Sequence, residues 1–330
     1  MPQDDGERAA MTRFLITGGG GFVGQWVARA LLARGDDVVL AGLGTLDHGP
    51  AILAKDERKR VRWIAADMRK TDDVDRMVEQ SLADRIIHLA GVAFPPLAEK
   101  DPTATYDINA LGVVRLLAAV DKRRKAGVSD PTVVVVGSAT QYGTHGFAEM
   151  PLTEDAAQRP STVYAASKTS QEAIALAHFR SNGTKVVCTR SFNHSGVGHG
   201  REYLLPSLVQ KVKKVRHELV PTIGIGNDVV RDYLHVSDVA AAYIALSDRG
   251  RPGEAYNVAS GTGISVRDLA TEVLLLAGLA PDISSDPALI RGVDIPVLVG
   301  SPAKVKRDTG WTPRKTHADI IDDLLNAATD

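Results

Sequence analysis

Tyr164 and Lys168 are the two residues whose types and spacing most clearly suggest chemistry. They stand four positions apart in the segment Val-Tyr-Ala-Ala-Ser-Lys (163–168), so on a helix both side chains leave the same face. A phenol with a pKa of about 10 is a poor acid-base catalyst at neutral pH. A neighbouring ammonium lowers that pKa, so the pair predicts proton transfer to or from a substrate oxygen. The alternative, for the pair taken alone, is two exposed side chains on a solvated helix.

The first element that must position this pair is a glycine turn near the N-terminus. A strand-like run at 13–17 leads into Gly18, Gly21 and Gly24, and a helical apolar repeat follows. Strand, glycine turn and helix in this order let the backbone approach a pyrophosphate, whose charge then lies at a helix N-terminus. We therefore predict a dinucleotide site that includes Phe22 and Val23. The alternative is a flexible glycine loop.

The end of the second predicted strand bears on the choice of dinucleotide. The strand at 38–41 runs into Ala-Gly-Leu-Gly, where this fold usually carries a carboxylate that binds the adenosine ribose. The missing carboxylate removes a source of repulsion against a 2′-phosphate, although no arginine stands beside Gly42. The sequence therefore favours NADP, with NAD as the alternative.

Residues at the ends of the next two predicted strands complete the expected cofactor site. Asp67 and Met68 would lie near the adenine, and the alternative for Asp67 is a simple strand-end cap. Ala90 and Gly91 follow the fourth strand, and small residues suit a backbone pressed against a cofactor. The third, fourth and fifth strands are predicted at 61–67, 85–90 and 132–136.

The fifth predicted strand ends in the second candidate for chemistry. Its four consecutive valines are typical of a parallel strand that is buried on both faces. Ser138 and Thr140 follow, and a hydroxyl at the carboxyl end of such a strand points toward the place where α/β proteins bind ligands. We also predict a helix that begins at Asn109, with Leu111 and Val114 on its apolar side, and a basic helix at 203–219.

Composition limits the remaining possibilities. The 330 residues are 44% hydrophobic and 24% charged, with a formal net charge of −1, so nothing indicates a nucleic-acid or membrane surface. The single cysteine, Cys188, rules out a disulfide framework and stands in an apolar run, which favours a core position over a nucleophile. We see no metal-ligand set and no membrane-spanning run, and we expect a cytoplasmic protein with a disordered leader at 1–11.

Taken together, these motifs resemble those of the extended short-chain dehydrogenase/reductases. The resemblance rests on the glycine turn, Asp67, Asn109, Ser138 and the Tyr164–Lys168 pair in this order, and it covers residues 12 to 325. It implies a Rossmann-type doubly wound parallel sheet with a smaller C-terminal α/β domain that binds a nucleotide sugar. The division would be 12–190 plus about 232–259 for the dinucleotide domain, and 191–231 plus 260–330 for the second. It also implies that Asn109 helps to bind the cofactor and that two copies dimerise through a four-helix bundle.

Two further segments resemble enzymes that handle GDP-mannose derivatives. They are Arg-Ser-Phe-Asn-His-Ser-Gly-Val-Gly (190–198) and the segment from Arg-Gly-Val-Asp-Ile-Pro (291–296) to Trp-Thr-Pro (311–313). By this resemblance Asn193, Arg231 and Arg291 would contact the nucleotide diphosphate, since a guanidinium offers a fork of donors to phosphate oxygens. The alternative for each arginine is a structural ion pair.

Two sets of catalytic residues that related enzymes carry are missing from this sequence, and this decides which reaction we predict. The 4,6-dehydratases of this group carry carboxylates at the positions held here by Ala139 and Thr140, and the fucose-forming enzymes use a cysteine-histidine pair. We therefore predict reduction of GDP-4-dehydro-6-deoxy-D-mannose to GDP-D-rhamnose. Tyr164 would donate the proton, Lys168 would tune it and hold the nicotinamide ribose, and Ser138 would bind the same oxygen, with Thr140 beside it. The alternatives are a nucleotide-sugar C4 epimerase and a non-enzymatic NADP-sensing protein.

Overall fold

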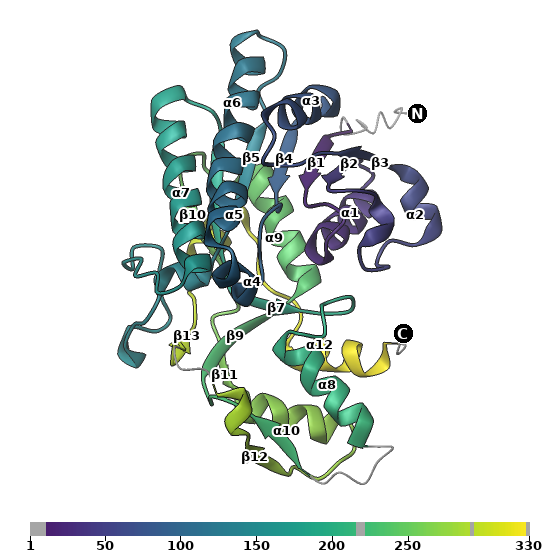
Figure 1. Cartoon of the computed structure of the whole chain (residues 1–330), viewed down its shortest axis with the longest axis vertical. Coiled ribbons are helices and arrows are strands. Elements are labelled where there is room, and N and C mark those ends of the chain that lie inside the picture. The colour runs from purple at the N-terminus through teal and green to yellow at the C-terminus, as the bar shows by residue number, and fades with distance from the viewer. Residues whose placement is uncertain (1–10, 216–221, 291–293, 328–330) are drawn as a thin grey trace, which may run out of the picture.

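A seven-stranded parallel sheet forms the larger part of the computed structural model, which describes residues 11–215, 222–290 and 294–327 (Figure 1). The strand order is β10-β6-β5-β4-β1-β2-β3, and all six neighbouring pairs are parallel. The order reverses between β1 and β4, which is the place where doubly wound folds bind ligands. The predicted Rossmann-type fold is thus confirmed. The strands are β1 (Arg13–Thr17), β2 (Asp37–Gly42), β3 (Val61–Ala65), β4 (Arg85–His88), β5 (Thr132–Ser138), β6 (Val186–Ser191) and β10 (Ala255–Val258).

Helices cover both faces of this sheet because its strands are apolar on both sides. The core on one face is shared with α1 and α9, and the core on the other with α3, α6 and α7. Val133, Val134 and Val135 of β5 alternate between the two cores and are all buried. The helices of this part are α1 (Phe22–Arg34), α2 (Lys55–Arg60), α3 (Thr71–Ser81), α4 (Pro95–Lys100), α5 (Pro102–Tyr106), α6 (Gly112–Lys125), α7 (Val163–Asn182), α9 (Val236–Arg249) and α11 (Ala303–Thr309).

A smaller part lies at the carboxyl ends of the sheet strands and has its own core (Figure 1). Its strands form one sheet around β9 and a second sheet of β8 with β12. Its elements are β7 (Asn193–Ser195), α8 (Leu204–Val215), β8 (Ile223–Ile225), β9 (Val230–His235), β11 (Gly263–Ser265), α10 (Val266–Leu276), β12 (Ile283–Ser285), β13 (Val297–Leu298) and α12 (His317–Asn326). The chain passes between the parts several times, because β10 and α11 return to the large sheet after β9 has joined the small one.

The helix predicted to begin at Asn109 begins earlier. Pro102 starts α5, and α5 continues through a π-helical turn at Asp107–Leu111 into α6, so Asn109 lies inside a long helical segment. The side chains of Leu111 and Val114, expected on the apolar inner face, are 48% and 43% exposed. The described part of the predicted basic helix is α8, and positions 216–219 lie outside the described residues, as do positions 1–10 of the predicted leader.

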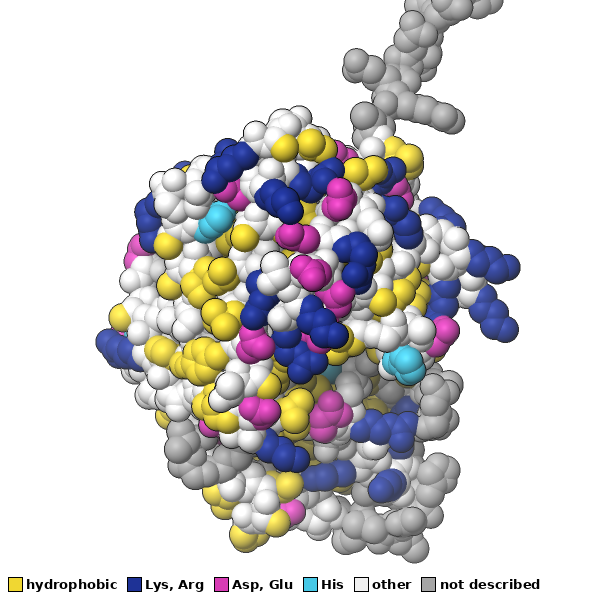
Figure 2. Space-filling model, turned by 45° about the horizontal axis from the view of Figure 1, so that its top comes forward, with side chains coloured by type: hydrophobic (Ala, Val, Ile, Leu, Met, Phe, Trp, Pro, Cys, Tyr) yellow, Lys and Arg dark blue, Asp and Glu magenta, His cyan; other side chains and the backbone are white. Residues whose placement is uncertain are grey.

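The helices and the surface charge bear on two possibilities, a membrane-spanning protein and a strongly charged surface. In the described ranges, every helix is too short or too polar to cross a membrane. Figure 2 shows one face of the molecule, on which lysine and arginine side chains are interspersed with aspartate and glutamate.

Candidate active site

The glycine turn has the geometry that a bound pyrophosphate requires. Gly18 adopts a φ of +68°, and a Cβ there would lie 2.8 Å from the backbone nitrogen of Ala90. A Cβ on Gly24 would lie 2.6 Å from the carbonyl oxygen of Gly18. Gly21 caps α1 without any side chain bonded to the first turn, which contains no acidic residue. Phe22 and Val23 begin that helix, so their backbone forms its positive end.

The loop after β4 lies against this turn and against α7. A Cβ on Gly91 would lie 2.7 Å from Oδ1 of Asn109 and 3.6 Å from Nζ of Lys168, so the three residues are neighbours. The Asn109 side chain accepts from Val92 N at 2.8 Å and donates to Val92 O at 3.2 Å and to Ser167 Oγ at 2.9 Å. Asn109 therefore ties the loop to the helix that carries Tyr164, because both of its amide hydrogens are donated within the chain.

Ser138 contacts both Thr140 and Tyr164. The Ser138 and Thr140 hydroxyl oxygens are 2.9 Å apart, and Thr140 N donates to Ser138 Oγ at 3.3 Å. Burial raises the pKa of the Tyr164 phenol above its ordinary value, and a hydrogen bond with Ser138 lowers it. Both hydroxyls thus lie at the carboxyl end of β5, beside the phenol.

Lys168 is buried at the same end of β5, but the described contacts of its ammonium differ from the expected one. Its Nζ donates to Val136 O at 2.9 Å and to Gln171 Oε1 at 3.0 Å, and burial lowers its pKa to about 8. Burial and Ser138 are the influences on the Tyr164 pKa, so the lowering expected from Lys168 is not seen in the structure. In the structure the ammonium is instead bonded to Val136 O and Gln171 Oε1.

The residues expected near the adenine occupy the end of β3. Asp67 forms a bidentate ion pair with Arg69, whose hydrogen bonds hold the pKa of the Asp67 carboxyl below its usual range. Met68 is buried in the sheet core, and its carbonyl oxygen accepts from Arg115 at 3.1 Å. The end of β2 is overlaid by Trp63, whose Nε1 donates to Gly44 O at 2.9 Å.

The residues expected to bind the nucleotide diphosphate lie on the smaller part. Asn193 is exposed on β7, opposite Tyr233 of β9. Arg231 on β9 donates to Asp294 at 2.6 Å, so the ion pair considered as its structural alternative is present. Arg291 lies outside the described residues.

Sequence reasoning missed a stack of aromatic rings that joins the two parts of the molecule. Phe22 at the start of α1 stacks on His199 with centroids 4.7 Å apart, and His199 stacks on Tyr203 at 4.1 Å. Phe94 meets Tyr203 edge-on at 5.4 Å. Burial raises the pKa of Tyr203 to about 12, and Glu202 and Tyr164 add to this rise, so the stack lies close to the Tyr164 phenol. No local pattern could reveal it, because the rings come from three distant segments.

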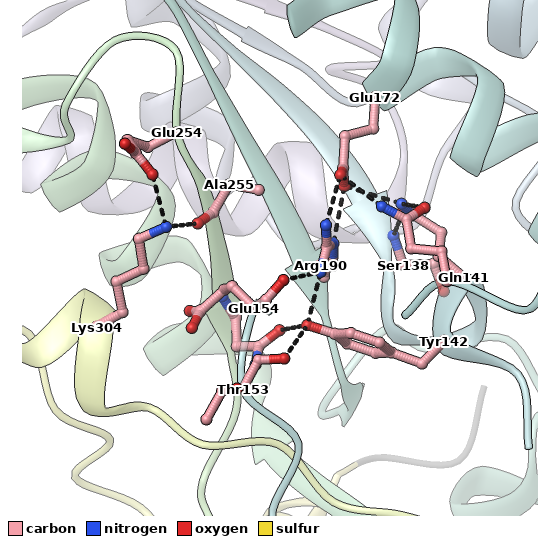
Figure 3. A network of polar contacts seen from close by, with 12 residues as sticks. Ser138, Gln141, Tyr142, Thr153, Glu154, Glu172, Arg190, Glu254, Ala255 and Lys304 are labelled. Carbon is pink, nitrogen blue, oxygen red and sulfur yellow. Dashed lines mark hydrogen bonds and ion pairs between the residues drawn. The ribbon is translucent and has the colours of Figure 1, made fainter. Parts of the chain in front are cut away.

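A second missed feature is a buried polar network beneath Ser138 (Figure 3). The sequence motifs point only to single positions in this network. In the structure, Glu172 bonds to both Gln141 and Arg190, and the three residues belong to three different elements. Cys188, next to this network on β6, is 1% exposed, and burial raises its pKa, which confirms a core position. Across the described residues, no group of three or more histidine, cysteine, aspartate or glutamate side chains could hold a metal ion.

The fold and the site together define a class of protein. A glycine turn at the switch point of a doubly wound sheet, with a serine at the carboxyl end of a strand and a tyrosine and lysine in the first turns of the next helix, characterises the extended short-chain dehydrogenase/reductases. The protein is an NAD(P)-dependent nucleotide-sugar oxidoreductase of this type.

Comparison with known proteins narrows the class to a family. The family model described as GDP-mannose 4,6 dehydratase matches residues 15–324, so the chain belongs to that family. GDP-6-deoxy-D-mannose reductase of Pseudomonas aeruginosa is 31% identical over 317 residues, 95% of this chain and 96% of the relative.

Two solved structures are similar over nearly the whole chain. The structure of RMD from Pseudomonas aeruginosa complexed with NADPH is 29% identical, with a TM-score of 0.78 over 95% of this chain and 98% of that one. UDP-glucose 4-epimerase of Thermus thermophilus, in complex with NAD, is 27% identical, with a TM-score of 0.80 over 96% and 100%. The relatives of this chain thus perform different reactions.

Proposed function

We propose that this enzyme reduces the C4 keto group of a nucleotide-linked 6-deoxy-4-keto sugar, converting GDP-4-dehydro-6-deoxy-D-mannose to GDP-D-rhamnose with NADPH. NADH is the alternative cofactor. The observation that carries the proposal is the segment Ser138-Ala139-Thr140 beside Tyr164, which offers two hydroxyls and no carboxylate. Dehydration needs a base to remove the C5 proton, and reduction does not.

The residues of the chain act on the C4 oxygen. A bound NADPH supplies the hydride that C4 receives. Tyr164 donates the proton to the oxygen on which negative charge develops, and its raised pKa keeps that proton on the phenol at neutral pH. Ser138 donates a hydrogen bond to the same oxygen, which stabilises charge that forms only in the transition state. Lys168, beside Gly91, holds the nicotinamide ribose.

Three residues are proposed to hold the nucleotide diphosphate, and one to support the sugar. Asn193, Arg231 and Arg291 would bind the phosphates, because a guanidinium matches phosphate oxygens in shape and charge. For Arg231 this requires that the guanidinium serve the phosphate while it remains paired with Asp294. Thr140 would add a hydrogen bond to the sugar from its place next to Ser138.

The relatives support the proposal to different degrees. The reductase from Pseudomonas aeruginosa matches nearly the whole chain, and a solved relative contains NADPH. The C4 epimerase remains the second candidate, because an epimerase relative has an equally similar fold and contains NAD. The missing carboxylate at the end of β2 favours the reductase, since an NAD-retaining epimerase uses that carboxylate to bind the ribose. The NADP-sensing alternative is disfavoured by the intact set of Ser138, Tyr164 and Lys168.

A panel of sugar nucleotides tests the proposal. GDP-, UDP- and dTDP-linked 4-keto-6-deoxy sugars are offered with NADPH or NADH, loss of absorbance at the nicotinamide band is followed, and the product is identified by NMR. We expect stoichiometric cofactor oxidation with the GDP-linked 4-keto sugar and NADPH. Interconversion of 4-hydroxy sugars without added cofactor would establish the epimerase instead, and cofactor binding without turnover on any sugar would revive the sensing protein.

We also propose that two copies associate through α6 and α7, which contact one another in one copy (Figure 1). The outward face of this helix pair is apolar and small: Leu111 and Val114 are exposed, and Ala173 and Ala177 are exposed on α7. Small side chains let helices approach closely, so two such pairs could form a four-helix bundle.

A further inference from the structure

We infer that Gln141 is a positioning residue that fixes Ser138 relative to Tyr164, and that the buried ion pair of Glu172 with Arg190 holds Gln141 in its working orientation (Figure 3). The inference rests on the proposed function, because it assigns Gln141 a role in placing the hydroxyl that binds the C4 oxygen.

Gln141 connects the strand end that carries Ser138 to the helix that carries Tyr164. Its Oε1 accepts from the backbone nitrogen of Ser138 at 2.8 Å, and its Nε2 donates to Glu172 Oε2 on α7 at 2.9 Å. Gln141 is fully buried in the 3-10 turn Ala139–Tyr142. The packing around it is tight, because a Cβ on Gly137 would meet Gln141 Oε1 at a distance of only 2.4 Å.

Glu172 occupies a place on α7 that suits this task. It follows Tyr164 and Lys168 at successive four-residue steps, so the three side chains share one helix face. Its carboxylate receives two hydrogen bonds from Arg190 of β6, at 2.7 and 3.0 Å, and one from Gln158 at 2.7 Å. The described bonds therefore tie α7, β6 and the Ser138 turn into one rigid unit.

The ion pair also fixes which way the Gln141 amide points. An ionised carboxylate only accepts hydrogen bonds, so the amide must present Nε2 to Glu172 and Oε1 to Ser138 N. Arg190 donates to both oxygens of the Glu172 carboxylate, and its remaining nitrogen donates to Tyr142 and to Glu154 O at 3.0 and 2.8 Å. A residue that cannot both accept and donate at position 141 would release the Ser138 turn.

Release of that turn should change the chemistry and not only the stability. The Ser138 hydroxyl lowers the pKa of the Tyr164 phenol by hydrogen bonding. If Ser138 moves away, this lowering is lost, so the phenol keeps its proton to higher pH. Reduction needs the protonated phenol, and its rate therefore falls as pH rises through the Tyr164 pKa. Misplacement of Ser138 should lower the plateau of kcat and move this fall to higher pH.

The first test compares Gln141→Met with Tyr142→Phe. The first variant removes the three bonds of the amide, to Ser138, Gln158 and Glu172, while Glu172 and Arg190 stay paired. The second removes a buried hydroxyl of the same network on the other side of Arg190. We expect Gln141→Met to lose about 10- to 100-fold in kcat with little change in KM, because small misplacements cost that much. In Gln141→Met the fall of kcat at high pH should begin at a higher pH than in the wild type. Tyr142→Phe should keep kcat and KM within about twofold of the wild type. Equal profiles for the two variants would overturn the inference.

A second variant, Gln141→Glu, tests the orientation of the amide. When position 141 is ionised it faces the Glu172 carboxylate, so one of the two acids must take up a proton. The protonated glutamic acid donates and accepts as the native amide does. The kcat of Gln141→Glu should therefore approach the wild-type value as pH is lowered and fall below it as pH rises. A constant ratio of the two rates across pH would count against the assigned orientation.

Hydrogen exchange separates failure of this inference from failure of the proposed function. If the wild type reduces no 4-keto sugar, the proposed function fails, and the placement of Ser138 is still measurable. Amide exchange of peptides covering 138–143 should rise about tenfold in Gln141→Met, because the turn opens locally, and peptides covering the glycine turn at 18–24 should be unchanged. Unchanged exchange at 138–143 would overturn the positioning role whatever reaction the enzyme performs.

Discussion

Two opposed influences set the pKa of the Tyr164 phenol. Burial raises its pKa, because the phenolate loses hydration, and the Ser138 hydroxyl lowers it by hydrogen bonding. The raised value means that the phenol carries its proton throughout the neutral range. This is the form that a reductase needs, whereas the oxidative half of an epimerisation begins with a phenolate.

Replacement of Tyr164 by phenylalanine should abolish the proton donor with little change in shape. We expect kcat to fall by about 10²- to 10⁴-fold, which is the usual contribution of a general acid. The dissociation constant for NADPH should stay within about twofold, since the ring is retained. Steady-state rates and a titration of NADPH fluorescence check the two parts. Turnover near that of the wild type would reject the assignment.

The Lys168 ammonium predicts a pH dependence of cofactor affinity. Its pKa is lowered to about 8 by burial, so the charged form, which we propose donates to the nicotinamide ribose, prevails below that pH and is lost above it. The dissociation constant for NADPH should therefore rise between pH 7 and pH 9 in the wild type. Lys168→Met should bind more weakly at pH 7 and should lack this rise. The same dependence in both proteins would assign the change to another group.

At the scale of elements, the glycine turn makes a sharp steric prediction. Gly24→Ala places a Cβ against Gly18 O and Gly19, at 2.6 to 2.9 Å, so α1 must move away from the turn. We expect about a tenfold loss of NADPH affinity and a lower melting temperature. Gly146→Ala is the matched control, because its Cβ would meet only Glu149 Oε1, at 3.5 Å. Wild-type NADPH affinity in Gly24→Ala would show that the turn does not hold the pyrophosphate.

The elements that sequence predicts well are those specified by neighbouring residues. The strand, glycine turn and helix around Gly21 are local, and so are the valines of β5. The helix start predicted at Asn109 is wrong because the start signal lies upstream: Asp101 caps α5 and Pro102 is its first residue, and the helical segment continues through the π-helical turn that contains Asn109. The Gln141–Glu172 bond could not be predicted, since α7 must first pack on the sheet to bring the two side chains together.

For the whole molecule, the proposed dimer depends on the exposed side chains of Leu111, which ends the π-helical turn, and Val114 of α6. Leu111→Arg with Val114→Arg would bury charges at the interface, so we expect dissociation to monomers, seen by sedimentation velocity. Leu275→Arg, at an exposed apolar position on α10, serves as the control and should leave the sedimentation coefficient unchanged. An unchanged coefficient in the double variant would place the interface elsewhere.

Strand β10 sets the order in which this chain can fold as it is made. It pairs with β6 at one end of the sheet, yet it leaves the ribosome only after β7, α8, β8 and β9 of the smaller part have been synthesised. Until then β6, with its apolar run Val186-Val187-Cys188, is an open edge of the kind that invites association between nascent chains. At translation rates of about 5–20 residues per second, this interval lasts for seconds, so stalled or truncated chains that end before residue 255 should aggregate.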